Sequence, residues 1–222
     1  MRLRSKLLIA LVALGILVVI GMLFIREKEP SYNGHPLSYW VSHSYTRNPD
    51  EYALAKKAVQ AIGTNAIPYF DEWVRYKPSP LRRSVNRNLP AALRRPHPGV
   101  LALRGFGLLG PDCSPAAAHL AAIMQDTSQP VPAELAMYAL SRMGVAGLPH
   151  LSAALADTNL PFRGEILVQI GSEMLPAIGT NRCLSAIQPA LQDPDFEIRV
   201  GASNFVNHLT PLILKNFFPF SS

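Results

Sequence analysis

The chain has 222 residues and a mass of 24.3 kDa, with 21 basic and 15 acidic residues and a formal net charge of +6. Its length suits one domain of moderate size, and twenty prolines and fourteen glycines indicate short, frequently interrupted elements. The charge is uneven, which excludes a uniformly basic protein: no acid occurs between Glu72 and Asp112, whereas acids outnumber bases after Cys113.

The first thirty residues differ in character from the rest. From Leu7 to Ile25 the chain has no charged residue, and as a helix this stretch is about 28 Å long at ~1.5 Å per residue, enough to cross a hydrocarbon core. A cleaved signal peptide is the alternative, but its apolar region usually has about 7–15 residues and ends at a small-residue cleavage site. We therefore expect residues 1–29 to form a cytoplasmic stub and an uncleaved transmembrane anchor.

The charges that flank this stretch predict its orientation. Arg2, Arg4 and Lys6 precede it without an acid, whereas the charges of residues 26–29 cancel. Since cytoplasmic flanks carry the excess of Lys and Arg, the expected localisation is the bacterial inner membrane, single-pass, with a cytoplasmic N-terminus and the remaining chain outside the cytoplasm.

Residues 30–49 form an aromatic juxtamembrane segment that contains Tyr32, Tyr39 and Trp40. A ligand groove and a position at the lipid interface are both possible interpretations. We favour a hydrophobic cap over the first repeat, because terminal repeats need a distinct closing surface.

A repeat becomes visible when four glycines are aligned. The residues one and four positions before each glycine are apolar, and those eight before are small, as in Ala55, Val59 and Ile62 before Gly63. These offsets lie on one face of a helix, so each glycine is predicted to end an amphipathic helix whose narrow stripe packs closely. The four turn glycines, each expected in the left-handed conformation that is common after helices, are Gly63, Gly110, Gly144 and Gly179.

A second helix is predicted after each turn. In three copies a proline stands five residues after the glycine, which suits the first turn of a helix. These prolines are Pro68, Pro115 and Pro149. The stretch AIGTN occurs at two of the turns, where Thr or Asn is expected to cap the second helix. Gly171 competes with Gly179 for the fourth turn because Pro176 follows it by five residues; we favour Gly179.

Aspartates end the second helices, and in two copies an arginine follows six residues later. Asp157 with Arg163 and Asp193 with Arg199 therefore mark equivalent corners between repeats. Recurrence at equal spacing favours a structural ladder over a pair of catalytic groups, and a partly exposed ion pair of this kind contributes about 0–1 kcal/mol.

The stretches LGPDCSPAAAHLAAIMQD, ALSRMGVAGLPHLSAALAD and IQPALQDPDFEIRVGAS resemble HEAT and HEAT-like repeats of bacterial proteins, including membrane-anchored members. The resemblance covers about residues 32–210. It implies an α-solenoid, and for most such families protein–protein scaffolding; a minority act on pigments or nucleic acid.

A basic segment separates the first two repeats. Eight cations without an acid would attract phosphate, anionic lipid, an envelope polymer or an acidic protein, whereas a solvated insertion is the structural alternative. We do not expect a nucleic-acid partner, because Tyr76 alone supplies aromatic stacking in this segment. The candidate anion-binding and partner-binding residues are Arg75, Lys77, Arg82, Arg83, Arg87, Arg94, Arg95 and Arg104.

No pattern of catalytic, cofactor-binding or metal-binding residues is found, so we expect no enzyme activity and no cofactor. Cys113 and Cys183 lie two repeats apart, near 20 Å at ~10 Å per repeat, which is too far for the ~7 Å limit of a disulfide.

The sequence thus predicts an all-α chain: an N-terminal transmembrane helix, then a HEAT-like α-solenoid of about four to five antiparallel helix pairs. The repeat domain is expected over residues 50–210, with the basic insertion at 77–98 and an apolar C-terminal tail at 211–222. The expected function is a non-catalytic, membrane-anchored scaffold that binds an unknown partner protein on its second-helix surface. Electrostatic docking to anionic lipid, envelope polymer or nucleic acid through residues 75–104 is the alternative, and a HEAT-like lyase activity is the second alternative.

Overall fold

The structure is a computed structural model that describes residues 29–89 and 96–217. A compact unit begins at Ser31 with a short hairpin, β1 (Ser31–Tyr32) and β2 (His35–Pro36), in which Ser31 pairs with Pro36. Helix α2 (Leu37–His43) follows and packs against α3 and α6. Trp40 is buried, and its indole N–H donates a hydrogen bond to the Tyr32 carbonyl oxygen at 3.0 Å. The aromatic segment therefore packs against the first two repeats.

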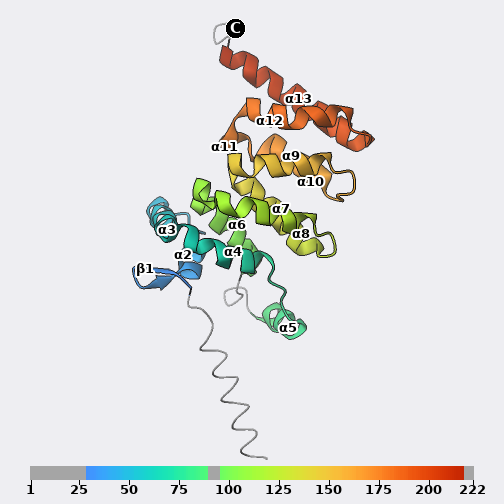
Figure 1. Cartoon of the computed structure of the whole chain (residues 1–222). Coiled ribbons are helices and arrows are strands. Elements are labelled where there is room, and N and C mark those ends of the chain that lie inside the picture. Colours follow the sequence, from blue (N-terminus) through green and yellow to red (C-terminus); the bar gives the residue numbers. More distant parts are fainter. Residues whose placement is uncertain (1–28, 90–95, 218–222) are drawn as a thin grey trace, which may run out of the picture. The chain divides into compact units, whose positions relative to one another are not determined.

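The rest of the unit is a stack of helix pairs that follows the sequence order (Figure 1). The pairs are α3 (Pro49–Ile62) with α4 (Ile67–Val74), α6 (Pro98–Leu109) with α7 (Ala117–Gln125), α8 (Pro130–Arg142) with α9 (Leu148–Ala156), and α10 (Arg163–Val168) plus α11 (Leu175–Ile178) with α12 (Thr180–Ile187). Helix α13 (Phe196–Phe217) ends the stack, and α5 (Pro80–Asn88) is drawn outside it. The all-α expectation is confirmed, and the fold is solenoid-like.

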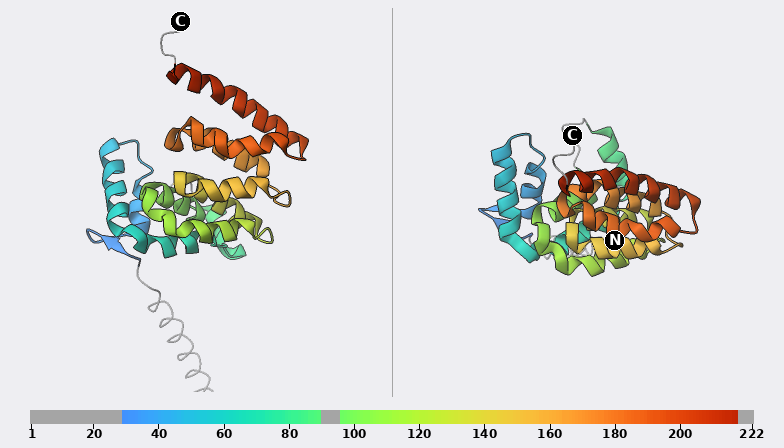
Figure 2. Two further views of the ribbon diagram at one scale, coloured as in Figure 1. Left: turned by 45° about the horizontal axis from the view of Figure 1, so that its top comes forward. Right: turned by 90° about the horizontal axis from the view of Figure 1, so that it is seen from above.

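The stack has two faces. The first helices of the pairs pack successively against one another and form the first-helix face. They are α3, α6, α8 and α10, the last together with the π-helical segment after it, and α13 packs against α10 at the end of the row. The second helices α7, α9 and α12 pack successively against one another and form the second-helix face. The left view of Figure 2 shows the same layered order of the chain within this unit.

The predicted stripe of small and apolar residues is the core of the stack. In α3 the residues at the predicted offsets, Ala55, Ala58, Val59 and Ile62, are all buried, and the equivalent stripes of α6 and α8 are buried too. Small side chains allow close helix approach: a Cβ on Gly105 would lie 2.3 Å from the Phe70 ring of the preceding repeat. The periodicity therefore predicted the packing correctly.

All four turn glycines have positive φ, between 60° and 82°. The conformation differs from the expected left-handed helical one, because Gly63, Gly110 and Gly179 have ψ near −143°, −134° and 159°. That region is essentially restricted to glycine. The expected Thr or Asn caps in AIGTN do not form, since neither α4 nor α12 has a side-chain cap. After Gly63 the chain continues at once as the 3₁₀ turn Gly63–Ala66, and this turn leads directly into α4.

The fourth pair is irregular, and Pro176 accounts for it. Gly179 is the turn, whereas Gly171 is buried in a π-helical segment, Gln169–Glu173. Pro176 has no N–H and its ring clashes with the carbonyl four residues earlier, so a regular helix cannot run through it. The helix instead forms a wider, π-helical turn, in which the Met174 N–H donates a hydrogen bond to the Gln169 carbonyl oxygen five residues back at 2.9 Å.

The aspartate corners recur as local caps. The carboxylates of Asp126, Asp157 and Asp193 each accept a hydrogen bond from the backbone N–H two residues on, at 3.2, 3.0 and 2.9 Å. This Asx turn redirects the chain toward the next first helix. Each corner therefore needs its aspartate for the turn itself.

Arg163 joins two neighbouring corners, whereas Arg199 bonds within its own corner. Arg163 donates from Nε to the Leu155 carbonyl oxygen at 2.8 Å and pairs through Nη2 with Asp193 of the next corner. Arg199 bonds the carbonyl oxygens of Asp193 and Pro194 at 2.6 and 2.8 Å. The Arg163–Asp193 pair is 5% and 8% exposed, so the sequence estimate for a partly exposed pair does not apply.

The membrane part of the expected architecture needs correction. Within residues 29–89 and 96–217 no helix is both long enough and apolar enough to span a bilayer. The longest, α13, has sufficient length but carries Glu197, Arg199 and Lys215. The transmembrane element of the fold class and the inner-membrane localisation are therefore withdrawn. The expected span from Leu7 to Ile25 lies outside the described residues.

Two further boundaries can be placed on the structure. The expected insertion at 77–98 includes α5, while residues 90–95 lie outside the described part. The expected tail at 211–222 begins inside helix α13, which continues to Phe217.

Candidate binding grooves on the first-helix face

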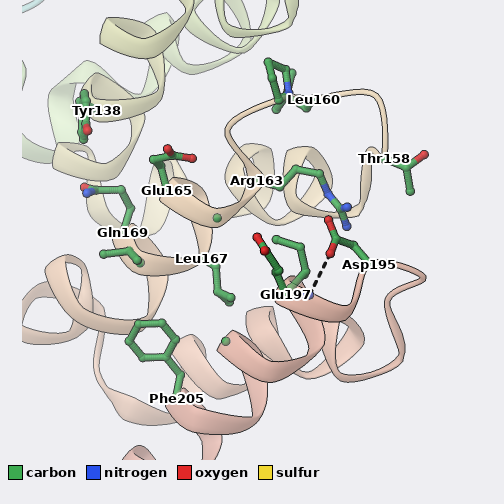
Figure 3. A pocket seen from close by; sticks show the side chains of 15 residues that line it. Tyr138, Thr158, Leu160, Arg163, Glu165, Leu167, Gln169, Asp195, Glu197 and Phe205 are labelled. Carbon is green, nitrogen blue, oxygen red and sulfur yellow. Dashed lines mark hydrogen bonds between the residues drawn. The ribbon is translucent and has the colours of Figure 1, made fainter.

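A groove of about 800 Å³ lies between α10 and α13 on the first-helix face (Figure 3). We call it the acidic groove, after Glu165, Asp195 and Glu197. Its apolar lining includes Leu167 from α10 and Phe205 from α13, and the corner between α9 and α10 closes one end. Its full lining is Tyr138, Thr158, Leu160, Pro161, Arg163, Gly164, Glu165, Leu167, Val168, Gln169, Asp195, Glu197, Ile198, Gly201 and Phe205.

The elements around the acidic groove are set by close packing. A Cβ on Gly171 would lie 2.5 Å from the Phe205 ring, and one on Gly201 would lie 2.8 Å from Leu167 Cδ2. These two glycines allow α13 to approach α10 and the π-helical segment. The groove walls are therefore held by packed side chains on helices, which suits a preformed site.

Three carboxylates give the acidic groove its charge. Glu165, Asp195 and Glu197 are exposed, and among the described residues no cation lies within 4.0 Å of them. Asp195 accepts a hydrogen bond from the Glu197 N–H at 2.8 Å (Figure 3), which caps the start of α13. The lining cation, Arg163, is already neutralised by Asp193. The groove is thus negative although the whole chain carries +6.

The carboxylate of Asp193 stays ionised beneath this groove. Burial acts to raise its pKa, but the Asp195 N–H and the Arg163 guanidinium act in the opposite direction. The balance leaves the pKa of Asp193 below its ordinary value. At neutral pH the pair therefore holds the corner as an ion pair, and Arg163 adds no free charge to the groove.

The cations of the basic segment that the structure describes do not gather on one surface. Arg75 lies on the second-helix side, in contact with His119, which lies 3.8 Å from Asp71. Lys77, Arg83 and Arg87 are exposed on or near α5, which also carries Arg82, while Arg94 and Arg95 lie outside the described residues. Arg104 is half-buried on the first-helix face, where it bonds Ser44. A continuous run in sequence is therefore divided among α4, α5 and α6.

No family model, no curated protein and no solved structure matches the chain. The HEAT-like resemblance therefore stays a prediction, and the candidate function depends on the grooves themselves.

The second-helix surface, on which the sequence analysis placed partner binding, offers less. A depression of about 380 Å³ lies between α9 and α12, lined by Leu148, Pro149, Ser152, Asn181, Arg182, Ser185 and Ala186. The acidic groove has about twice that volume and three carboxylates, whereas the smaller depression carries one charged residue, Arg182. Sequence reasoning missed the acidic groove because its lining comes from two helices about thirty residues apart, together with Tyr138 of α8.

Proposed function

We propose that this chain is a non-catalytic repeat protein of the HEAT-like kind that binds a partner polypeptide on its first-helix face. The acidic groove holds a basic, amphipathic segment of that partner. The observation that carries this proposal is a groove that combines apolar side chains with three carboxylates, none of which has a cation within 4.0 Å among the described residues.

The apolar lining supplies the binding free energy in this account. Among the apolar residues that line the groove, Val168 is 47% exposed, Phe205 is half-buried and Leu167 is buried. Apolar side chains in a groove that also carries polar groups are typical of interaction sites. Burial of such surface favours association by roughly 25 cal/mol per Å² before the costs of ordering are subtracted.

The rim supplies the selectivity. Carboxylates without partners attract lysine and arginine side chains, speed the encounter and repel acidic segments. Because the rim is exposed to solvent, added salt should weaken the attraction. Two other expectations, anion docking through the basic segment and a lyase-type activity, stay predictions; exposed Arg83 and Arg87 on α5 support the first.

The proposal predicts charge-dependent binding of a simple probe. A labelled peptide of five Lys-Leu repeats should bind the full chain, as measured by fluorescence anisotropy at low salt. Glu165→Gln together with Glu197→Gln should weaken binding about tenfold, since each removed rim charge is worth about 0.2–1 kcal/mol.

Two controls make the measurement specific. Asp112→Asn removes an exposed carboxylate outside the acidic groove and should leave the affinity unchanged. A Glu-Leu peptide of the same length should not bind. Asp112→Asn removes one charge and the groove variant two, so a control loss of half the binding free energy lost in the groove variant would show that net charge alone attracts the peptide, and the proposal would then fail.

A further inference from the structure

A second groove lies beside the acidic groove on the first-helix face. It has a volume of about 450 Å³, and α3, α6, α8 and the π-helical segment all contribute residues to it. We call it the arginine groove, after Arg104 and Arg142. Tyr138 lines both grooves, and the π-helical segment gives Gln169 to one and Glu173 to the other. π-Helical segments are frequent at functional sites.

Arg104 is held in place before any ligand arrives. Its Nε donates to the hydroxyl of Ser44 at 3.0 Å, and its Nη2 donates to the carbonyl oxygen of the same buried serine at 2.7 Å. The rings of Tyr45 and Tyr52 lie 5.1 and 5.2 Å from its Cζ, within the range of cation–π attraction. The side chain has therefore already lost the rotational freedom that binding would otherwise remove.

The remaining donor capacity of Arg104 is not used within the described structure. None of its hydrogen bonds involves Nη1, and no carboxylate of the described chain lies within 4.0 Å of its guanidinium. It is the single charged residue of α6. A half-buried cation with aromatic neighbours and no counter-ion is an arrangement that suits an external anion.

Arg142 brings a second positive charge to the same groove from the end of α8. Burial raises the pKa of Tyr45, while the charges of Arg104 and Arg142 both act to lower it, so both guanidinium groups are within electrostatic reach of that phenol. Gly107 lines the groove as well, and a Cβ there would lie 3.9 Å from the Cβ of Arg142. Its missing side chain keeps the groove open next to Arg142.

We propose that the arginine groove is an oxyanion site that takes a carboxylate or a phosphate group. Guanidinium groups match the geometry of both anions, with shorter and stronger hydrogen bonds than neutral donors make. The volume of about 450 Å³ is within the usual range of ligand sites. The source of the anion rests on the proposed function: because the two grooves share Tyr138, an acidic side chain of the polypeptide that binds the acidic groove could reach the arginine groove. The anion site itself does not depend on the proposed function.

The test uses NMR of the full chain labelled with ¹⁵N-arginine and follows the side-chain Nε–H resonance of Arg104. That resonance is assigned by its loss from the spectrum of Arg104→Lys. Acetate and inorganic phosphate are the two probes, each titrated at ionic strength matched with chloride. We expect a saturable shift of the Arg104 signal with at least one of them, and the stronger binder identifies the ligand as a carboxylate or a phosphate. Arg142→Gln should weaken that binding about tenfold, the equivalent of one charge-assisted hydrogen bond.

The variants keep the test decisive. Arg142 and Arg182 are both exposed, so neither Arg142→Gln nor the control Arg182→Gln should disturb the fold, and Arg182→Gln should bind as the wild type does. The proposal is wrong if neither anion gives a saturable shift, or if Arg142→Gln binds as tightly as the wild type. The Lys-Leu peptide carries no anionic side chain, so its binding to the acidic groove succeeds or fails separately.

Discussion

Arg163→Met is expected to lower the free energy of unfolding by about 3–5 kcal/mol, because it leaves Asp193 as an uncompensated buried charge. Arg163 also donates to the Leu155 carbonyl oxygen, so the same change removes a hydrogen bond at the preceding corner. Urea unfolding of the full chain, followed by circular dichroism, measures the loss. The matched control is Arg182→Met in α12, an exposed arginine whose replacement should change stability by no more than about 0.5 kcal/mol.

The double variant Arg163→Met with Asp193→Asn should be more stable than Arg163→Met alone, because asparagine removes the buried charge and keeps an oxygen that accepts from the Asp195 N–H. A loss below about 1 kcal/mol for Arg163→Met would mean that the pair is not buried in solution and that the corners are not joined in this way.

The same pair predicts how stability depends on pH. Because the pKa of Asp193 is lower in the folded than in the unfolded chain, its contribution is fully present above the unfolded value of about 3.9. That contribution is lost as the pH falls through the lower, folded-state pKa. Asp193→Asn should therefore lose less stability than the wild type between about pH 5 and pH 3. Parallel acid profiles for the two proteins would contradict the assignment.

Gly147→Ala is the second change with a large expected effect. Its φ is −83°, which any residue adopts, so the requirement for glycine is one of space. A Cβ at this position would lie 1.9 Å from the Leu140 carbonyl oxygen and 2.7 Å from its carbon, and a backbone atom cannot rotate away. We expect a loss of about 3 kcal/mol or more, at the upper end of overpacking effects.

Gly164→Ala is the matched control for Gly147→Ala. A Cβ on Gly164 meets no atom within 4 Å, its φ is not positive, and the residue lies in α10. Alanine should therefore raise stability by about 0.4–1 kcal/mol, since it reduces the freedom of the unfolded chain. Thermal unfolding followed by circular dichroism should separate the two variants clearly. Similar melting temperatures for both would show that α8 and α9 are not packed as described.

The sequence contains enough information to predict most of the fold. The offsets before Gly63 and its counterparts place apolar residues on one face, and packing of that face is a local consequence of helix geometry. The π-helical segment could not be read in the same way. Pro176 signals an interruption, but how the chain accommodates it depends on the neighbouring α13, whose Phe205 ring packs on Gly171.

The candidate sites were less predictable, because they depend on contacts between distant residues. Arg104 appeared to belong to a basic run, yet its hydrogen-bond partner Ser44 is 60 residues away. The recurrence of aspartate and arginine marked equivalent corners, but the partner of Arg163 is Asp193, 30 residues on, and not Asp157. Spacing along the chain shows which residues are equivalent, and only the stacking of repeats decides which of them meet.

Binding of a basic polypeptide segment in the acidic groove is tested most directly by a photoreactive benzoylphenylalanine in place of Val168, which lines that groove, together with the Lys-Leu peptide. Val145 is equally exposed, at 51% against 47%, but does not line the groove, so the same replacement there is the control. We predict a peptide adduct from position 168 that excess unlabelled peptide suppresses, and little or none from position 145. Equal adducts from both positions would contradict the account.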